Sequence, residues 1–207
     1  MTPLYKTLNS KSMPLDPEVL SRLCLYLEEN HAPVQRPRFL GSGSFGYAFK
    51  INNEKAVKLT SDDKEAWVAD YLREKNLPKT SPLVRVFDVA EIYNVDGEPI
   101  YAIVEEFLKP ASKKWRNFAR DFLAQDEKKR SDEDDDYWFY GENTLKTLPE
   151  YGYSREEEKW AKKFIKTLNK FGIKYNDLHE KNILMRNGFP VAIDINNGVP
   201  ERKIKQI

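Results

Sequence analysis

The sequence is poor in three features that mark other classes of protein: cysteine, charge of one sign and long apolar runs. Its single cysteine, Cys24, excludes an intrachain disulfide and a zinc site built from cysteines, and a reducing compartment fits best. With 34 Lys and Arg against 33 Asp and Glu, the net charge is +1, so the basic excess of a nucleic-acid-binding domain is missing. No run approaches the roughly 18 apolar residues that span a bilayer, and the start shows no signal-peptide pattern. We therefore expect a cytoplasmic protein that binds neither nucleic acid nor membrane.

The chain is instead rich in charged and aromatic residues. Charged residues make up 32% and hydrophobic residues 40%, against about 25% and about 45–50% in average soluble domains. The 11 Phe, 11 Tyr and 4 Trp supply enough apolar area for the core of one domain or of two small lobes.

Residues 1–37 predict a helical extension. Asp16 and Pro17 have the types favoured at the N-cap and at the first position of a helix, and leucines then recur at helical spacing up to Asn30.

Residues 38–108 predict a compact α+β lobe. Short β-type runs are joined by turn residues such as Asn52 and Asn53, and a helical run from Ser61 to Asn76 interrupts them. The expected order of elements is two strands, one helix and two further strands.

Residues 109–207 predict a second, mainly helical lobe. Ser154 and Glu157 form the capping-box pattern that starts a helix. The stretch 111–150 is rich in charge, and its run from Lys128 to Asp136 predicts a solvated loop or linker. A docking patch for a basic partner is the alternative for the acidic part at 132–136.

A glycine-rich segment opens the predicted β-rich lobe. Its G-x-G-x-x-G spacing lets backbone N–H groups approach phosphate oxygens, although a glycine-rich hairpin without a ligand is the alternative. A dinucleotide-binding fingerprint would need a helix directly afterwards, whereas strand-forming residues follow here. The candidate nucleotide-binding residues are Gly41, Ser42, Gly43, Ser44, Phe45 and Gly46.

Lys58 lies in the next predicted strand, where a cation can reach phosphates held by the glycine-rich segment. A lysine in an apolar strand needs a partner. Glu65, at the start of the following helix, is the candidate, and Glu74 is the fallback if Glu65 is an ordinary surface residue.

Three polar residues cluster near the end of the sequence. Asp177 and Asn182 have the spacing D-x-x-x-x-N, and Asp194 follows after a hairpin turned by Asn187 and Gly188. Asn and Asp oxygens suit Mg²⁺ bound to phosphate, and a further carboxylate can orient or deprotonate a hydroxyl.

Taken in order, these motifs resemble those of the protein-kinase-like phosphotransferase superfamily. The stretches AVK at 56–58, YNDLHEKN at 175–182 and DIN at 194–196 resemble V-A-I-K, H-R-D-L-x-x-x-N and D-F-G. The resemblance is to a truncated form similar to small phage-encoded protein kinases. It implies an α+β, two-lobed fold with a β-rich N-lobe and a reduced, mainly helical C-lobe.

The resemblance also implies ATP and Mg²⁺ as cofactors. Lys58, paired with Glu65, would orient the phosphates, and Asp177 would act on the attacking hydroxyl. Asn182 and Asp194 would hold the metal.

The adenine would bind at the hinge that resembles the stretch 104–108. Glu106 and Leu108 would contact it through their backbone, and a shift of this alignment by one residue is the alternative.

The chain also departs from the family pattern. Tyr175 and Asn176 replace the His and Arg before the catalytic Asp, and the sequence ends at residue 207, 13 residues after Asp194. We therefore expect no activation segment of the usual kind. His179 resembles the D-L-H-x-x-N pattern of small-molecule phosphotransferases.

The expected function is that of a protein serine/threonine kinase, which transfers the γ-phosphoryl group of ATP to protein hydroxyls. Host proteins and the chain itself are among the candidate substrates. The alternatives are an aminoglycoside-like small-molecule phosphotransferase and a catalytically weak nucleotide-binding module that docks to a host protein.

Overall fold

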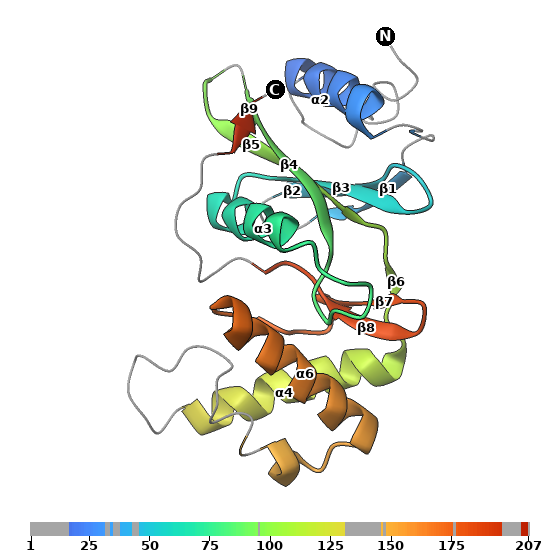
Figure 1. The fold of residues 1–207 in the computed structure, drawn as a ribbon, viewed down its shortest axis with the longest axis vertical. Helices are drawn as coiled ribbons and strands as arrows, with labels where there is room; N and C mark the ends of the chain where they lie inside the picture. The colour runs from blue at the N-terminus through green and yellow to red at the C-terminus, as the bar shows by residue number, and fades with distance from the viewer. Residues whose placement is uncertain are drawn as a thin grey trace. The chain divides into compact units, whose positions relative to one another are not determined.

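A computed structural model gives the fold, which divides into two compact units (Figure 1). Unit 1 is formed by Met1–Asn76, Val86–Phe107 and Glu201–Ile207, and unit 2 by Leu77–Arg85 and Leu108–Pro200. The structure describes residues 17–31, 34, 38–42, 46–94, 96–130, 146, 148–175, 177–195 and 204–206. None of the helices in these ranges has the length and apolar character that crossing a membrane requires.

Unit 1 is built on a six-stranded sheet with the order β1-β2-β3-β5-β4-β9. Neighbouring strands are antiparallel except for β9, which runs parallel to β4. The predicted hairpin at Asn52 is present, and the Asn52 side chain accepts hydrogen bonds from the backbone N–H groups of Glu54 and Lys55. The strands are β1 (Arg38–Ser42), β2 (Gly46–Lys50), β3 (Lys55–Thr60), β4 (Val86–Tyr93), β5 (Pro99–Glu106) and β9 (Lys205–Gln206).

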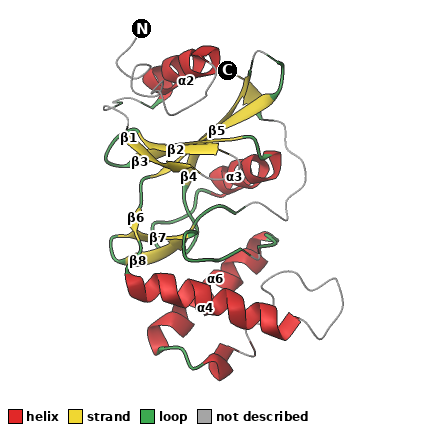
Figure 2. Ribbon diagram, turned by 180° about the vertical axis from the view of Figure 1, so that it is seen from behind, coloured by secondary structure: helices red, strands yellow, loops and turns green. Residues whose placement is uncertain are grey.

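Two helices, α2 (Pro17–Asn30) and α3 (Asp63–Lys75), cover opposite faces of this sheet (Figures 1 and 2). The leucines of α2 pack with alternate strand residues such as Val57 and Leu59. Side chains alternate between the two faces of a strand, so Lys58, between those two residues, faces α3.

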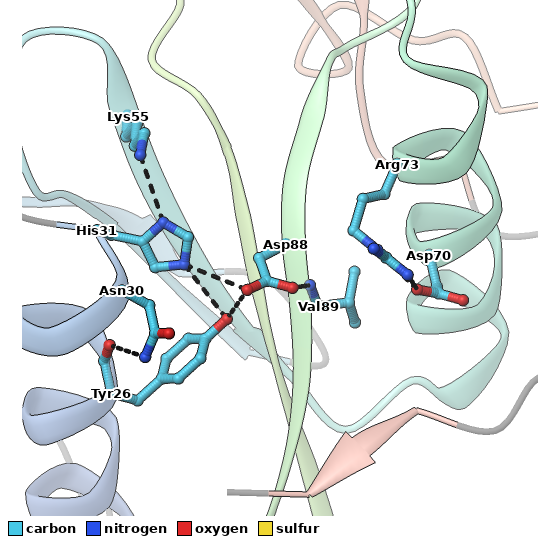
Figure 3. Close-up of polar contacts among 8 residues, drawn as sticks. All are labelled: Tyr26, Asn30, His31, Lys55, Asp70, Arg73, Asp88 and Val89. Carbon is cyan, nitrogen blue, oxygen red and sulfur yellow. Dashed lines mark hydrogen bonds and ion pairs between the residues drawn. The ribbon is translucent and has the colours of Figure 1, made fainter.

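A buried polar network connects α2 with β4 (Figure 3). The Tyr26 hydroxyl donates to the Asp88 carboxylate, and His31 Nε2 lies 3.2 Å from the Tyr26 oxygen and 3.5 Å from Asp88 Oδ2. Lys55 Nζ lies 3.4 Å from His31 Nδ1. Burial raises the pKa of Asp88, but hydrogen bonds from His31, Tyr26 and the Val89 N–H outweigh it and lower the pKa to about 2.

Helix α3 has a defined start and end. The Asp62 carboxylate caps it by accepting from the N–H groups of Lys64 and Glu65, and Asn76 ends it in the left-handed conformation. The predicted helix is therefore confirmed, with its first residue at Asp63 rather than Ser61 because Asp62 provides the cap.

In its described residues, unit 2 contains helical segments and a small antiparallel sheet with the order β6-β7-β8. The predicted capping box of Ser154 and Glu157 is present at the start of α6, and Gly172 ends that helix at φ 65°. The elements are β6 (Lys109–Pro110), α4 (Lys113–Arg130), the 3-10 helix η1 (Leu148–Tyr151), α6 (Arg155–Phe171), β7 (Ile183–Arg186) and β8 (Phe189–Ala192).

The prediction of a solvated loop or linker is wrong for Lys128, Lys129 and Arg130, which end α4, a helix that occupies the first half of the charged insert 111–150. Trp115, Phe118 and Phe122 of this helix are buried at helical spacing. Trp115 and Phe118 pack against Trp160 of α6, with ring centroids 5.9 and 5.7 Å apart. Burial of these rings stabilises a helix whose other residues are mostly charged. The acidic run at 132–136 lies outside the described residues.

The segment between α3 and β4 belongs to unit 2. Its backbone pairs with Ala192 of β8, and the buried guanidinium of Arg186 donates to the carbonyl oxygens of Lys79, Ser81 and Leu83. The Arg186 contacts fix this segment beside the strand that leads to Asp194.

Candidate functional site

The predicted ion pair of unit 1 is present. Lys58 Nζ lies 2.6 Å from Glu65 Oε1, and the two side chains are 19% and 10% exposed. The pair forms because β3 directs Lys58 toward α3, while the cap at Asp62 places Glu65 in the first turn of α3. The carboxylate holds the ammonium group in one position, and the role of this group in binding phosphate stays a prediction.

The glycine-rich segment is described in part. Gly41 and Ser42 end β1 and Gly46 begins β2, whereas Gly43, Ser44 and Phe45 lie outside the described residues. A Cβ on Gly46 would lie 1.7 Å from the carbonyl oxygen of Leu59. Gly46 is therefore required by the close approach of β3, whatever the segment binds.

The predicted hinge residues lie where β5 ends. Glu106 is the last residue of β5, and the N–H of Phe107 donates to the carbonyl oxygen of Glu54 over 2.8 Å. Leu108 follows and packs with Val84 and Val191 of unit 2. The Phe107 N–H is thus used within the protein, and contacts of Glu106 and Leu108 with adenine stay predictions.

The loop after α6 carries the central residues of unit 2. The Asn182 side-chain amide donates to the Asp177 backbone carbonyl oxygen over 3.0 Å and to Asp177 Oδ2 over 3.2 Å. Asn182 is buried at 4% exposure, whereas the Asp177 side chain is 52% exposed. A buried amide therefore fixes a carboxylate that remains accessible to a substrate.

Asp194 is brought beside Asn182 by the β7–β8 hairpin. Ile183, just after Asn182, pairs with Ala192 of β8, and the N–H of Ile193 donates to the Asn182 carbonyl oxygen over 3.0 Å. Asp194 has φ 56°, a left-handed conformation that is rare outside glycine. Such backbone strain is concentrated at functional positions.

His179 lies next to the Asp177 carboxylate. The backbone N–H of Lys181 donates to His179 Nδ1 over 3.1 Å, so a neutral imidazole carries its proton on Nε2. Nε2 lies 3.7 Å from Asp177 Oδ2. The loop thus turns the N–H of His179 toward the candidate base.

The donor set of unit 2 suits a magnesium ion bound together with a phosphate. Asn182 and Asp194 each offer a hard oxygen, and Mg²⁺ in phosphotransfer sites takes only one or two protein ligands besides phosphate and water. Over the described ranges no group of three or more His, Cys, Asp or Glu residues forms a metal cluster.

Tyr175 is the residue whose contribution the sequence did not indicate. It counted only as a departure from the family pattern, yet its hydroxyl lies 2.9 Å from the Asp177 carbonyl oxygen and 3.1 Å from that of Ile193. Its place two residues before Asp177 is the only signal in the sequence.

Comparison with known proteins gives matches at the level of structure alone. No protein-family model and no curated protein matches the chain. The chain is similar to an aminoglycoside phosphotransferase in a ternary complex with streptomycin and ATP, at 18% identity and a TM-score of 0.39, covering 90% of this chain and 73% of that one. It is also similar to a MAP kinase from Leishmania major, at 18% identity and a TM-score of 0.43, covering 87% of this chain and 51% of that one.

A second aminoglycoside phosphotransferase, in complex with AMP-PNP and hygromycin B, is 16% identical with a TM-score of 0.31. That match covers 44% of this chain and 30% of the other. The chain therefore spans about half the length of the MAP kinase and less than a third of this phosphotransferase.

Proposed function

We propose that the protein is a phosphotransferase that uses ATP and Mg²⁺ to phosphorylate serine and threonine hydroxyls of proteins. The observation that carries this proposal is the loop in which the buried Asn182 amide holds the accessible Asp177 carboxylate, with Asp194 fixed beside Asn182. Phosphoryl transfer needs little covalent chemistry from the protein, so positioned charges of this kind are its main requirement.

Lys58 supplies the cation for the phosphates of the nucleotide. Its pairing with Glu65 at 2.6 Å costs side-chain freedom, and at 19% and 10% exposure the lost hydration of the two charges offsets much of their attraction. A pre-oriented ammonium group contributes mainly when a negatively charged ligand binds to it.

Asp177 orients the acceptor hydroxyl and takes its proton as the new bond to the γ-phosphorus forms and the bond from that phosphorus to ADP breaks. Asn182 and Asp194 would hold the magnesium ion, which when bound neutralises charge on the phosphate oxygens. The Asn182 amide, which donates to Asp177 Oδ2, keeps the carboxylate directed toward the acceptor.

A protein substrate is favoured over a polycationic drug by the charge of α6, the helix that leads into the loop. Lys159, Lys163, Lys166 and Lys170 are exposed and recur at the spacing of one helix face. A row of lysines repels aminoglycosides, which are polycations, whereas it tolerates neutral or acidic protein segments.

A small-molecule phosphotransferase is the second candidate. It is favoured by His179, which matches the D-L-H-x-x-N pattern and whose Nε2 lies 3.7 Å from Oδ2 of the candidate base. Turnover of ATP with a sugar or an aminoglycoside, and none with proteins, would select this candidate.

The proposal is tested by comparing the phosphoproteomes of cells that produce the wild type, Asp177→Asn or Glu180→Gln. Glu180 is an exposed carboxylate of the same loop and serves as the matched control. We expect many phosphorylation sites that depend on Asp177 and persist in Glu180→Gln. Purified protein with γ-labelled ATP gives the direct reading, in which Asp177→Asn lowers the rate by about 10²–10⁴.

Two results would contradict the proposal. Labelling that survives both Asp177→Asn and Lys58→Met would remove the assigned residues from the reaction. Nucleotide binding without any transfer, together with a stable protein partner, would instead identify a docking module.

A further inference from the structure

Helix α6 carries a row of lysines on the side that faces solvent. Its large apolar residues, among them Trp160, Phe164 and Leu168, are buried on one side of the helix. Exposed lysines recur on the opposite side at the spacing i, i+4, i+7 and i+11, which places them on one face over a length of about 16 Å. The residues of this lysine face are Lys159, Lys163, Lys166 and Lys170.

The positive charge of the lysine face is not balanced within the helix. The acidic residues of α6, which are Glu156, Glu157 and Glu158, all lie in its first turn, and no further Asp or Glu occurs between Lys159 and Phe171. Within the described part of the chain, no carboxylate forms an ion pair with the four lysines. The whole chain has a net charge of only +1, so the lysine face is a local concentration of charge.

Stability does not account for the lysine face. Like charges three and four residues apart on a helix repel one another and destabilise it. Lys163 Nζ donates to the Thr80 carbonyl oxygen over 2.5 Å and lies 5.2 Å from the ring centroid of Phe189. Lys170 Nζ lies 5.4 Å from the ring centroid of Phe171. An ammonium group has three N–H donors, so these contacts position the two groups and leave donors for a ligand.

An acidic protein segment fits the lysine face better than a membrane or a nucleic acid does. Carboxylates along one side of such a segment face the lysines and offset their mutual repulsion. A helix that binds a membrane inserts its apolar side, whereas that side of α6 is buried within the protein. A long nucleic acid extends past the row to the glutamates of the first turn, and the chain lacks the basic excess of nucleic-acid-binding domains.

We propose that the lysine face is a docking surface for an acidic segment of the protein substrates, in addition to the serine or threonine that accepts the phosphate. This inference rests on the proposed function, because it names the class of substrate on which the same enzyme acts. Helix α6 ends at Phe171, shortly before Asp177, and both belong to unit 2. Docking on α6 raises the effective concentration of the acceptor hydroxyl, which lowers KM for the substrate and leaves kcat unchanged.

The first test measures binding and does not depend on activity. The probe is a fluorescein-labelled peptide of alternating Glu and Ala residues, titrated by fluorescence anisotropy at low and at physiological salt. The face variant combines Lys159→Gln, Lys163→Gln, Lys166→Gln and Lys170→Gln. The control variant removes the same charge from exposed lysines elsewhere, through Lys64→Gln, Lys75→Gln, Lys113→Gln and Lys146→Gln.

We expect the peptide to bind the face variant about tenfold more weakly than the wild type, as the loss of several exposed ion pairs implies. The control variant should keep nearly the affinity of the wild type. Because the four lysines repel one another, the face variant should melt at the temperature of the wild type or above it. Weaker binding therefore does not result from unfolding.

The second test measures phosphoryl transfer to two serine peptides that differ only in an acidic extension. For the extended peptide, the face variant should raise KM about tenfold with kcat unchanged. For the short peptide it should change neither quantity. The control variant should behave like the wild type with both peptides.

Equal losses in the face and control variants would overturn the inference, as would a failure of the acidic peptide to bind the wild type at low salt. Tighter binding of a single-stranded DNA oligonucleotide or of phosphatidylserine vesicles than of the peptide would also overturn it. If the wild type transfers no phosphate, the proposed function fails, whereas peptide binding that depends on the lysine face still supports a docking surface. Transfer with a KM that is independent of the four lysines leaves the proposed function in place and removes this inference.

Discussion

The amide of Asn182 donates to both the backbone carbonyl and the carboxylate of Asp177, over 3.0 and 3.2 Å. A buried residue thereby holds an exposed one. Only four residues separate the two in a tight loop. If the loop opens, both hydrogen bonds are lost, and the exposed carboxylate no longer keeps its position.

We expect Asn182→Ala to reduce kcat by about 10–100-fold, because the variant loses both the support of Asp177 and a candidate metal ligand. The concentration of Mg²⁺ that gives half the maximal rate should rise as well. Steady-state kinetics over a Mg²⁺ series measures both quantities. Asn169→Ala, on the exposed surface of α6, is the control and should behave like the wild type.

Lys58→Met should reduce kcat/KM for ATP by about 10²–10³, because the variant lacks the cation directed at the nucleotide phosphates. Glu65→Gln should have a smaller effect in the same direction. Calorimetric titration with an ATP analogue separates an effect on nucleotide affinity from an effect on the transfer step. The control is Lys64→Met, an exposed lysine next to Glu65, and an equal loss in that variant would refute a specific role for Lys58.

Gly46→Ala should destabilise the protein by about 1–3 kcal/mol, because its Cβ would overlap the carbonyl oxygen of Leu59 in the neighbouring strand. Gly41→Ala is the matched variant, since a Cβ there meets nothing within 4 Å. Urea unfolding of both variants measures the difference. Equal free energies of unfolding would show that β2 moves away from β3 without cost.

The Asp88 network predicts a dependence of stability on acid. The pKa of Asp88 is about 2 in the folded protein, below the ordinary value of 3.8, so its stabilising contribution is complete above pH 3.8. It is lost as the pH falls from there toward 2. Asp88→Asn should therefore melt at a lower temperature than the wild type at pH 7, with the gap closing below pH 3.8.

Thermal melts from pH 7 to pH 2.5 measure that gap. Asp96→Asn, an exposed aspartate in the turn after β4, should show no gap at any pH. A gap for Asp88→Asn that stays constant down to pH 2.5 would contradict the assignment.

Much of the fold could be predicted because its signals are local. Capping residues, leucine spacing and asparagine turns give α2, α3, α6 and the β2–β3 hairpin. The ion pair of Lys58 and Glu65 could be predicted as well, since strand alternation and the first turn of a helix decide which side chains meet.

The rest of the fold depends on packing contacts that the residue composition does not reveal. In α4 the charged residues around Trp115, Phe118 and Phe122 resemble a solvated loop unless the spacing of the rings is weighed above the charge. Strand β9 contains two residues and has no pattern of its own. Tyr175 and Arg186 donate to backbone carbonyl groups, which every residue possesses, so no side-chain motif predicts these contacts.

The pairing of β9 with β4 has a consequence for the order of assembly. Lys205 of β9 pairs with Ala90 at the edge strand β4, and Ala90 emerges from the ribosome much earlier than Lys205. The sheet of unit 1 is therefore completed only after the residues of unit 2 have been synthesised, and until then the edge of β4 is open to pairing with other chains. A stalled ribosome would prolong that interval, and aggregation during synthesis should rise with it.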